Sequence, residues 1–291
     1  MTAVRIALPP GYRVADVLAF HARDAEGVAE QLTAAGFRKG VLLDGVPVLF
    51  DVAFGADAAH CTLAADGALP GTAGAALPGM LALCIDPAPF AAAVRADPWF
   101  GPLVARTPGL RIVQSASVFE ALTWAIIGQQ INVAFAIALR RTLILQAGRQ
   151  HSSGIWCYPE AADVAALDVD ALTARKFSRA KAQTIVRLAR LVAAGELSLA
   201  LDAPVADIAA RLLAVKGIGP WTVNYALLRG YGYADCSLHG DVAVRAALQK
   251  LLGEDVKPDI ARTEGLLARY APYRTMAAAY LWHSLAPDQL A

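Results

Sequence analysis

The sequence predicts a mainly α protein, in which a small α+β domain with an antiparallel sheet (residues 1–94) precedes an all-helical domain (residues 95–291). Short β-type apolar runs alternate with turn-rich pieces in the first hundred residues. From about Pro87 onward, apolar residues recur at the 3.6-residue spacing of helices. The 291 residues exceed the size at which single cores stop growing, about 250 residues, so we expect at least two units.

The elements of the first domain follow from local patterns. The run GVLLDGVPVLFDVAF (40–54) is rich in β-branched and aromatic residues and predicts strands. The segment DGALPGTAGAALPG (66–79) is rich in turn residues. The stretch DAEGVAEQLTA (24–34) predicts a helix.

In the second domain, Pro, Gly and Asp interrupt the helical pattern near residues 97–98, 108–109, 148–154 and 195–204. The stretches DIAARLLAV (207–215) and WTVNYALLRG (221–230) are separated only by the turn KGIGP. Two helices joined so tightly form a hairpin.

Composition and charge limit the classes of protein. With 57% hydrophobic and 18% charged residues, the chain is expected to fold into a packed core. The net charge of +1 divides into −4 over residues 1–100 (6 basic against 10 acidic) and +5 over the remainder (20 against 15), so positive charge lies C-terminally. No signal peptide or uninterrupted apolar stretch of about 20 residues is visible, and we expect a cytoplasmic protein without membrane contact.

The four cysteines lie far apart, with no CxxC pair. This spacing indicates neither a zinc site nor a disulfide framework, and we expect reduced, mostly buried thiols at Cys61, Cys84, Cys157 and Cys236.

The KGIGP turn could hold an anion. Gly217 and Gly219 lack side chains, and Pro220 suits the first turn of the next helix, so backbone N–H groups would point outward. Bare amides at a helix N-terminus bind phosphate. Ile218 would anchor the loop to the core. By itself a GxG turn is more often just a tight helix connection.

Four segments in order carry a resemblance to a known family. LLAVKGIGPWTVNYALL (212–228) and SLHGDVAVRAAL (237–248) are similar to the helix-hairpin-helix and the following Gly/Pro-rich loop with a catalytic Asp of the base-excision DNA glycosylases. The segment 108–139 resembles their DNA-probing helix and turn, and 274–284 resembles their final pocket helix. The layout is most similar to the 3-methyladenine DNA glycosylase II group. The resemblance implies two helical subdomains with the active-site cleft between them.

Asp241 is the candidate catalytic residue. Cleavage of an N-glycosidic bond builds positive charge on the sugar, which a fixed carboxylate stabilises. Asp241 follows Gly240 at the start of an apolar-periodic helix. An Asp at that position is ordinarily an N-cap. The resemblance implies the catalytic role, with no cofactor required.

The type of glycosylase follows from what the chain lacks. Bifunctional relatives carry a Lys in the second hairpin helix, whose amine forms a Schiff base with the sugar. Here that position matches Trp221, while Lys216 matches a different one. Endonuclease III relatives hold an iron–sulfur cluster on C-terminal cysteines, and residues 237–291 contain no Cys. We therefore expect a monofunctional enzyme.

Aromatic residues predict a pocket for a flipped base, because electron-rich rings attract a cationic alkylated purine. By resemblance the base pocket comprises Trp221, Tyr225, Trp282, His283 and Gln129. At 283 the best-known members have Tyr, so His283 either widens the range of accepted bases or is a partly exposed helix residue. Aromatics at i and i+4 are also common in cores. Trp124 and Phe135 are expected in the core.

The resemblance also implies DNA contacts. Gln130 is the candidate wedge that fills the space left by the flipped nucleotide, although a polar surface loop would look similar. Backbone carbonyls of Leu213, Val215 and Gly217 would bind a monovalent cation, Na⁺ or K⁺. The basic run 174–190 most often marks a solvated helix face, with weak DNA-backbone contact as the alternative.

The expected partner is double-stranded DNA with alkylated bases, and the expected state is a monomer. Two alternatives remain open: a non-catalytic protein that binds damaged DNA, and a glycosylase for mismatched or oxidised bases on the same fold.

Overall fold

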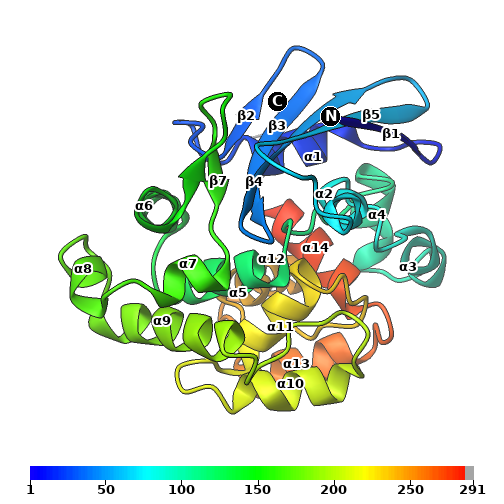
Figure 1. Ribbon diagram of the computed structural model, residues 1–291. Coiled ribbons are helices and arrows are strands. Elements are labelled where there is room, and N and C mark those ends of the chain that lie inside the picture. The colour runs from blue at the N-terminus through cyan, green and yellow to red at the C-terminus, as the bar shows by residue number, and fades with distance from the viewer. Residues whose placement is uncertain (286–291) are drawn as a thin grey trace.

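The computed structural model describes residues 1–285 and has a sheet-containing part packed on a larger helical part (Figure 1). The strands of the first part are β1 (Thr2–Ala7), β2 (Glu30–Leu32), β3 (Gly36–Leu43), β4 (Val46–Phe54) and β5 (Ala58–Ala65), with helix α1 (Val14–His21) between β1 and β2. A 3-10 turn (Ala73–Ala76) and the short helix α2 (Leu77–Met80) follow. The mainly α class with an N-terminal α+β unit is confirmed.

The sheet is mixed, whereas the sequence predicted an antiparallel one. Its order is β1-β5-β4-β3-β7-β6, with β2 beside β3, and β6 (Arg149–Gln150) and β7 (Trp156–Tyr158) come from the chain beyond residue 94. β7 runs parallel to β3, with Gly40 opposite Cys157. A Cβ at Gly40 would lie 2.4 Å from the Trp156 carbonyl oxygen, so only glycine admits this strand. The expectation of an all-helical second region is corrected accordingly.

The helix predicted at residues 24–34 is wrong. That stretch forms turns and then β2, and the helix lies earlier, at α1. Glu30 in β2 has its side chain fully buried on Lys39 of β3, 2.6 Å away, so a tertiary ion pair overrides the local helical pattern.

The remaining helices form the helical part. They are α3 (Ala88–Ala93), α4 (Phe100–Arg106), α5 (Val118–Gly128), α6 (Val133–Ala147), α7 (Ala161–Ala165), α8 (Val169–Thr173), α9 (Arg179–Ala193), α10 (Val205–Leu213), α11 (Pro220–Arg229), α12 (Val242–Leu252), α13 (Ile260–Ala268) and α14 (Arg274–Ser284). α10 and α11 form the predicted hairpin. None of the helices in residues 1–285 has the length and apolarity needed to span a bilayer.

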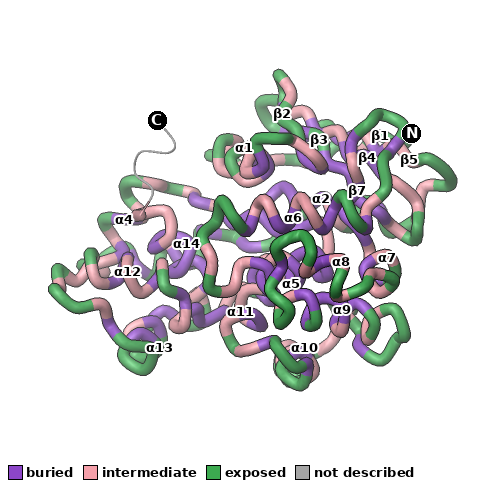
Figure 2. The backbone as a smooth tube through the Cα atoms, turned by 90° about the vertical axis from the view of Figure 1, so that its left-hand side faces the viewer, coloured by how far each residue is buried: buried purple, intermediate pink, exposed green. Residues whose placement is uncertain are grey.

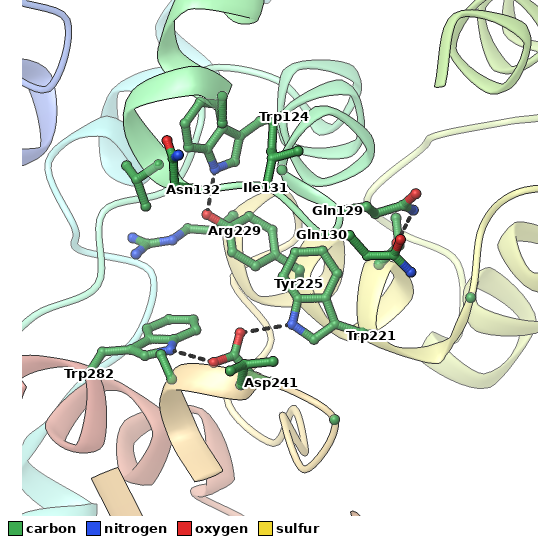
Figure 3. A pocket seen from close by; sticks show the side chains of 18 of the residues that line it. Trp124, Gln129, Gln130, Ile131, Asn132, Trp221, Tyr225, Arg229, Asp241 and Trp282 are labelled. Carbon is green, nitrogen blue, oxygen red and sulfur yellow. Dashed lines mark hydrogen bonds between the residues drawn. The ribbon is translucent and has the colours of Figure 1, made fainter. Parts of the chain in front are cut away.

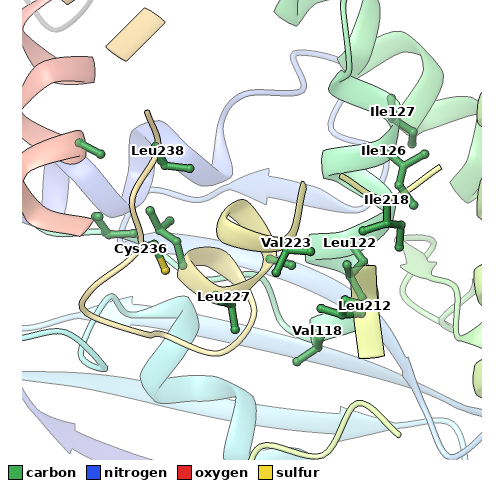
Figure 4. Packing of buried hydrophobic residues seen from close by; sticks show 14 of the residues in the cluster. Val118, Leu122, Ile126, Ile127, Leu212, Ile218, Val223, Leu227, Cys236 and Leu238 are labelled. Carbon is green, nitrogen blue, oxygen red and sulfur yellow. The ribbon is translucent and has the colours of Figure 1, made fainter. Parts of the chain in front are cut away.

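Two large hydrophobic cores support this arrangement, one under the sheet and a larger one among the helices, and a small third cluster contains Ala29, Ile144 and Tyr158. In Figure 2 the buried segments run through the middle of the molecule, and exposed segments surround them. In Figure 4, side chains of α5, α10 and α11 meet in the helical core, where Leu122, Leu212 and Val223 are at most 3% exposed. This packing holds α5 and the hairpin together as one unit.

The described cysteines are free, and three of the four are buried; Cys84 is exposed.

Candidate active site

A cavity of about 890 Å³ opens where the α5–α6 turn, α11, the start of α12 and α14 meet (Figure 3). Its lining includes four aromatic side chains, one carboxylate and one guanidinium: Trp124, Trp221, Tyr225, Trp282, Asp241 and Arg229. Segments more than 150 residues apart in the chain thus build one pocket.

Asp241 combines both roles considered from the sequence. It is the N-cap of α12, and its Oδ1 accepts the Val244 backbone N–H at 2.9 Å. The same carboxylate accepts the Trp221 indole N–H on Oδ2 at 2.8 Å and the Trp282 indole N–H on Oδ1 at 3.1 Å. Asp241 is only 9% exposed. Three donors from three helices therefore fix the carboxylate at the pocket surface.

The predicted aromatic residues lie together. The ring centroids of Trp221 and Tyr225 are 5.3 Å apart, and those of Tyr225 and Trp282 are 6.3 Å apart. Trp124 joins them, because its indole N–H donates to the Tyr225 hydroxyl at 2.8 Å. Trp124 was expected in the core, and it packs against the helical core while also lining the pocket. Phe135 is 37% exposed, so the core prediction is wrong for Phe135.

His283 is not among the residues that line the pocket in the described part of the chain. It is partly exposed near the end of α14. Partial burial lowers the pKa of His283, against an opposing effect of the Asp16 carboxylate. This position favours the second of the two roles considered for His283, that of a partly exposed helix residue.

The two glutamines of the α5–α6 turn differ in environment. Gln129 lines the pocket, but its amide donates to the Thr222 hydroxyl at 2.9 Å and to the Gly217 carbonyl at 3.2 Å, which ties the turn to the hairpin. Gln130 is exposed at the pocket rim with a φ of +55°, a conformation that non-glycine residues rarely adopt. Its side chain is accessible to solvent where it lines the pocket.

The hairpin turn has the expected conformation. Gly217 has a φ of +99°, and a Cβ there would lie 2.1 Å from the Thr184 hydroxyl oxygen. Ile218 is 5% exposed and belongs to the helical core. Gly219 is the N-cap of α11, where a Cβ would meet nothing within 4 Å, and Pro220 begins the helix. The space beside Gly219 at the start of α11 is thus open.

Arg229 was not identified from the sequence. It is the last residue of α11, one helical turn beyond Tyr225, and lines the pocket. Its spacing of i+4 from Tyr225 on the same helix was the signal that could have revealed it.

Several basic residues of the 174–190 run bind the protein itself. The Lys181 ammonium donates to the Ile127 carbonyl at 2.7 Å, and Arg187 donates to the Lys216 carbonyl at 3.1 Å. Partial burial lowers the pKa of Lys181. These contacts support the ends of α5 and the hairpin.

The chain is similar to known repair proteins. Residues 123–272 match the HhH-GPD superfamily of base excision DNA repair proteins. The chain is 33% identical over 179 residues to a provisionally named DNA-3-methyladenine glycosylase of Bacillus subtilis (strain 168), covering 61% of this chain and 62% of that protein. It is 30% identical over 205 residues to the DNA-3-methyladenine glycosylase of the same organism, covering 69% of this chain and 68% of that protein.

The fold is similar over a longer stretch. The 3-methyladenine DNA glycosylase from Archaeoglobus fulgidus superposes with a TM-score of 0.82 at 21% identity, covering 96% of this chain and 97% of that one. The protein belongs to the HhH-GPD superfamily of base excision DNA repair proteins. The family predicted from the sequence is therefore confirmed.

Proposed function

We propose that this protein is a monofunctional DNA glycosylase that flips alkylated bases such as 3-methyladenine out of duplex DNA and excises them by hydrolysis. The observation that carries the proposal is the Asp241 carboxylate, which faces an aromatic pocket and is held by the indole N–H groups of Trp221 and Trp282. The relatives named DNA-3-methyladenine glycosylases support the substrate class.

The reaction follows from this geometry. The flipped base stacks among the rings of Trp221, Tyr225 and Trp282, which favour a positively charged base. As the bond between C1′ and the base nitrogen breaks, its electron pair leaves with the base, which becomes neutral. Asp241 stabilises the positive charge that develops on the sugar. Water then forms a bond to C1′ and releases a proton to Asp241 or solvent, with no cofactor.

The pocket chemistry supports a single hydrolytic activity. A bifunctional enzyme needs an amine that attacks C1′. Among the described residues lining the cavity there is no lysine, and Trp221 occupies the matching position. Lys216 is not one of the described residues that line the cavity. Base release without strand cleavage is the consequence.

The DNA contacts are assigned to two turns. The hairpin turn of Gly217, Ile218 and Gly219 binds a phosphate through backbone N–H groups at the start of α11, where a Cβ at Gly219 would meet nothing within 4 Å. Gln130, exposed at the pocket rim, is the wedge that fills the space of the flipped nucleotide. The division into domains at residues 94 and 95 and a monomeric state belong to the same proposal.

We also propose a monovalent cation at the hairpin, held by the backbone carbonyls of Leu213, Val215 and Gly217. The Val215 carbonyl accepts the Ile218 N–H at 3.0 Å, and the Gly217 carbonyl accepts the Gln129 amide at 3.2 Å. Each oxygen has a second lone pair, and Leu213 precedes them at the exposed end of α10. Na⁺ or K⁺ held by these three carbonyls would add positive charge beside the phosphate.

The test is release of free 3-methyladenine from methylated duplex DNA, with strand nicking scored separately before alkali. The wild type should release base without nicking, and Asp241→Asn should release at least a hundredfold less because the amide cannot balance the cationic sugar. Asn still caps a helix, so folding should be retained.

Asp259→Asn is the matched control, because Asp259 caps α13 by accepting the Arg262 N–H, away from the pocket. It should keep full activity. Base release by Asp241→Asn at the wild-type rate would refute the catalytic role. No release by the wild type, with binding to abasic DNA retained, would favour the damage-binding alternative.

A further inference from the structure

The cavity contains a positive charge that excision of a cationic base does not need. Among the described lining residues, Arg229 is the only one with a positively charged side chain. An arginine there disfavours every cationic base to a similar extent, since like charges repel. We therefore expect Arg229 to make an interaction with the base that compensates this repulsion.

The guanidinium is held in place by both parts of the molecule. Its Nη1 donates to the Val113 carbonyl at 2.5 Å. Its carbon atom Cζ lies 5.0 Å from the ring centroid of Phe20 in α1 and 5.8 Å from that of Trp282 in α14. In Figure 3 the Arg229 side chain reaches past Tyr225 on the side of the pocket that faces Trp282. The group is positioned before any base enters.

Most of its hydrogen-bonding capacity is unused. A guanidinium has five N–H donors, and within residues 1–285 the contact to Val113 is the hydrogen bond that it makes. Its Nε is buried and has no partner among the described residues. The Nη2 atom likewise has no partner among the described residues and, unlike Nε, is not buried, so it is the donor that a base in the cavity can reach.

The neighbouring polar groups of the pocket are already committed. The indole N–H groups of Trp221 and Trp282 donate to Asp241, and that of Trp124 donates to the Tyr225 hydroxyl. Because the Tyr225 oxygen accepts this bond, its own O–H is free to donate. The unused groups on this side of the pocket are thus donors, which suit a base that presents an acceptor.

We propose that Arg229 is a specificity-determining residue that favours alkylated bases with a carbonyl oxygen at position 6, the alkylated guanines, over those with an amine there. Guanine presents O6 as an acceptor, whereas adenine presents an N6 amine, which is a donor. Arg229 donates to O6 and meets the N6 amine as donor against donor. This inference rests on the proposed glycosylase function and names its preferred substrate class.

The experiment compares release of 7-methylguanine and 3-methyladenine from the same methylated duplex. Both bases are cationic in DNA and neutral once released, so the effect of the Arg229 charge largely cancels in the ratio of the two rates. The ratio is also independent of the folded fraction of each preparation. We expect Arg229→Met to lower the ratio of 7-methylguanine to 3-methyladenine release at least tenfold, and Arg229→Lys to lower it less.

Arg106→Met is the matched control, because Arg106 is likewise the last residue of a helix, α4, and is exposed outside the pocket. Its ratio should equal that of the wild type. A ratio within twofold of wild type in Arg229→Met would overturn the proposal, while a wild type that releases neither base would overturn the glycosylase function instead.

If Arg229→Met releases neither base, the affinities of wild type and variant for the free bases test the proposal. Affinity is measured by the quenching of tryptophan fluorescence on addition of each free base. Relative to wild type, Arg229→Met should lose tenfold more affinity for 7-methylguanine than for 3-methyladenine. Equal losses for the two bases would overturn the proposal.

Discussion

Asp241 illustrates how one side chain can serve both the fold and the chemistry. Its Oδ1 caps α12 through the Val244 N–H, and its Oδ2 accepts only the Trp221 indole among the described residues. The capping hydrogen bond fixes the position of the Asp241 Cα and its χ1 angle, while the indole hydrogen bond fixes the plane of the carboxylate. Trp221 is therefore a positioning residue as well as a stacking surface.

Trp221→Phe should separate these two functions, since phenylalanine keeps an aromatic face but has no N–H. We expect the single-turnover rate of base release to fall about tenfold, the equivalent of about 1.4 kcal/mol, because a hydrogen bond to a charged group contributes about 1.5–3 kcal/mol. Affinity for abasic DNA should change little. Trp156→Phe in β7, outside the pocket, is the control, and an equal effect of both substitutions would contradict this role.

The family motifs in the sequence indicated the pocket residues that fall within them, including Trp282 and Gln129, which lie far from the hairpin in the chain. Trp221, Tyr225 and Asp241 fall in the hairpin and the loop that follows it. Trp124 donates a hydrogen bond to Tyr225, which lies 101 positions further along the chain. The Arg229 guanidinium packs over the ring of Phe20, which lies in another part of the fold. Such contacts depend on tertiary packing, which periodicity and turn chemistry do not encode.

At the scale of elements, the α10–α11 hairpin uses its two glycines for different purposes. Gly217 has a left-handed φ and lies against Thr184, so the fold needs it. Gly219 has ordinary φ and faces open space, so the fold does not need it. Its lack of a side chain has a use only if another molecule approaches closely.

Substitution of each glycine by alanine should show this difference. Gly217→Ala should destabilise the protein by about 1–3 kcal/mol, because the left-handed backbone is strained and Thr184 must move. Gly219→Ala should leave the melting temperature unchanged and weaken binding to abasic duplex DNA several-fold. Gly74→Ala, also in open space, is the control for both measurements. Unchanged DNA affinity of Gly219→Ala would argue against phosphate binding at this turn.

Local patterns predicted the hairpin well because a tight turn between two amphipathic helices leaves few alternatives. They failed at residues 24–34 and at β7, where the conformation depends on distant partners. β2 forms next to β3, with Glu30 on Lys39, and the three-residue β7 is a strand because Gly40 leaves space for its backbone. Short strands of this kind have too few residues for a periodic signal.

At the scale of the whole molecule, buried charges join the sheet to the helices. The Lys39 ammonium in β3 lies 2.6 Å from Glu30 and 2.8 Å from Glu120 of α5, and Arg140 of α6 lies 2.8 Å from Glu120. These four side chains are at most 2% exposed. Since α5 ends at the pocket turn, this cluster fixes the pocket relative to the sheet.

The cluster predicts acid sensitivity. Burial acts to raise the pKa of Glu120, but the charges of Lys39 and Arg140 outweigh it and lower the pKa to about 2. Burial and the same opposing charges leave the pKa of Glu30 well below its ordinary value. A carboxyl whose pKa is depressed by folding stabilises the protein above its unfolded pKa, near 4.3, and loses that contribution as the pH falls through the folded value. The free energy of unfolding should therefore decline between about pH 4.5 and pH 2.

Lys39→Met tests whether this cluster causes the decline. Removing one partner leaves buried carboxylates with less compensating charge, so the free energy of unfolding at pH 7 should fall by about 3–5 kcal/mol. The variant should also lose less further stability on acidification, because the pKa values of Glu30 and Glu120 move toward their ordinary range. Arg38→Met is the control, because Arg38 is the neighbour of Lys39 in β3 and forms an exposed ion pair with Asp51. It should lower the free energy of unfolding by at most about 1 kcal/mol and keep the wild-type pH dependence. Urea unfolding at pH 7, 4 and 3 measures both effects. Parallel pH profiles for the three proteins would mean that the charges at the junction act independently of Lys39, and the sheet and the pocket helices would then owe their alignment to apolar packing.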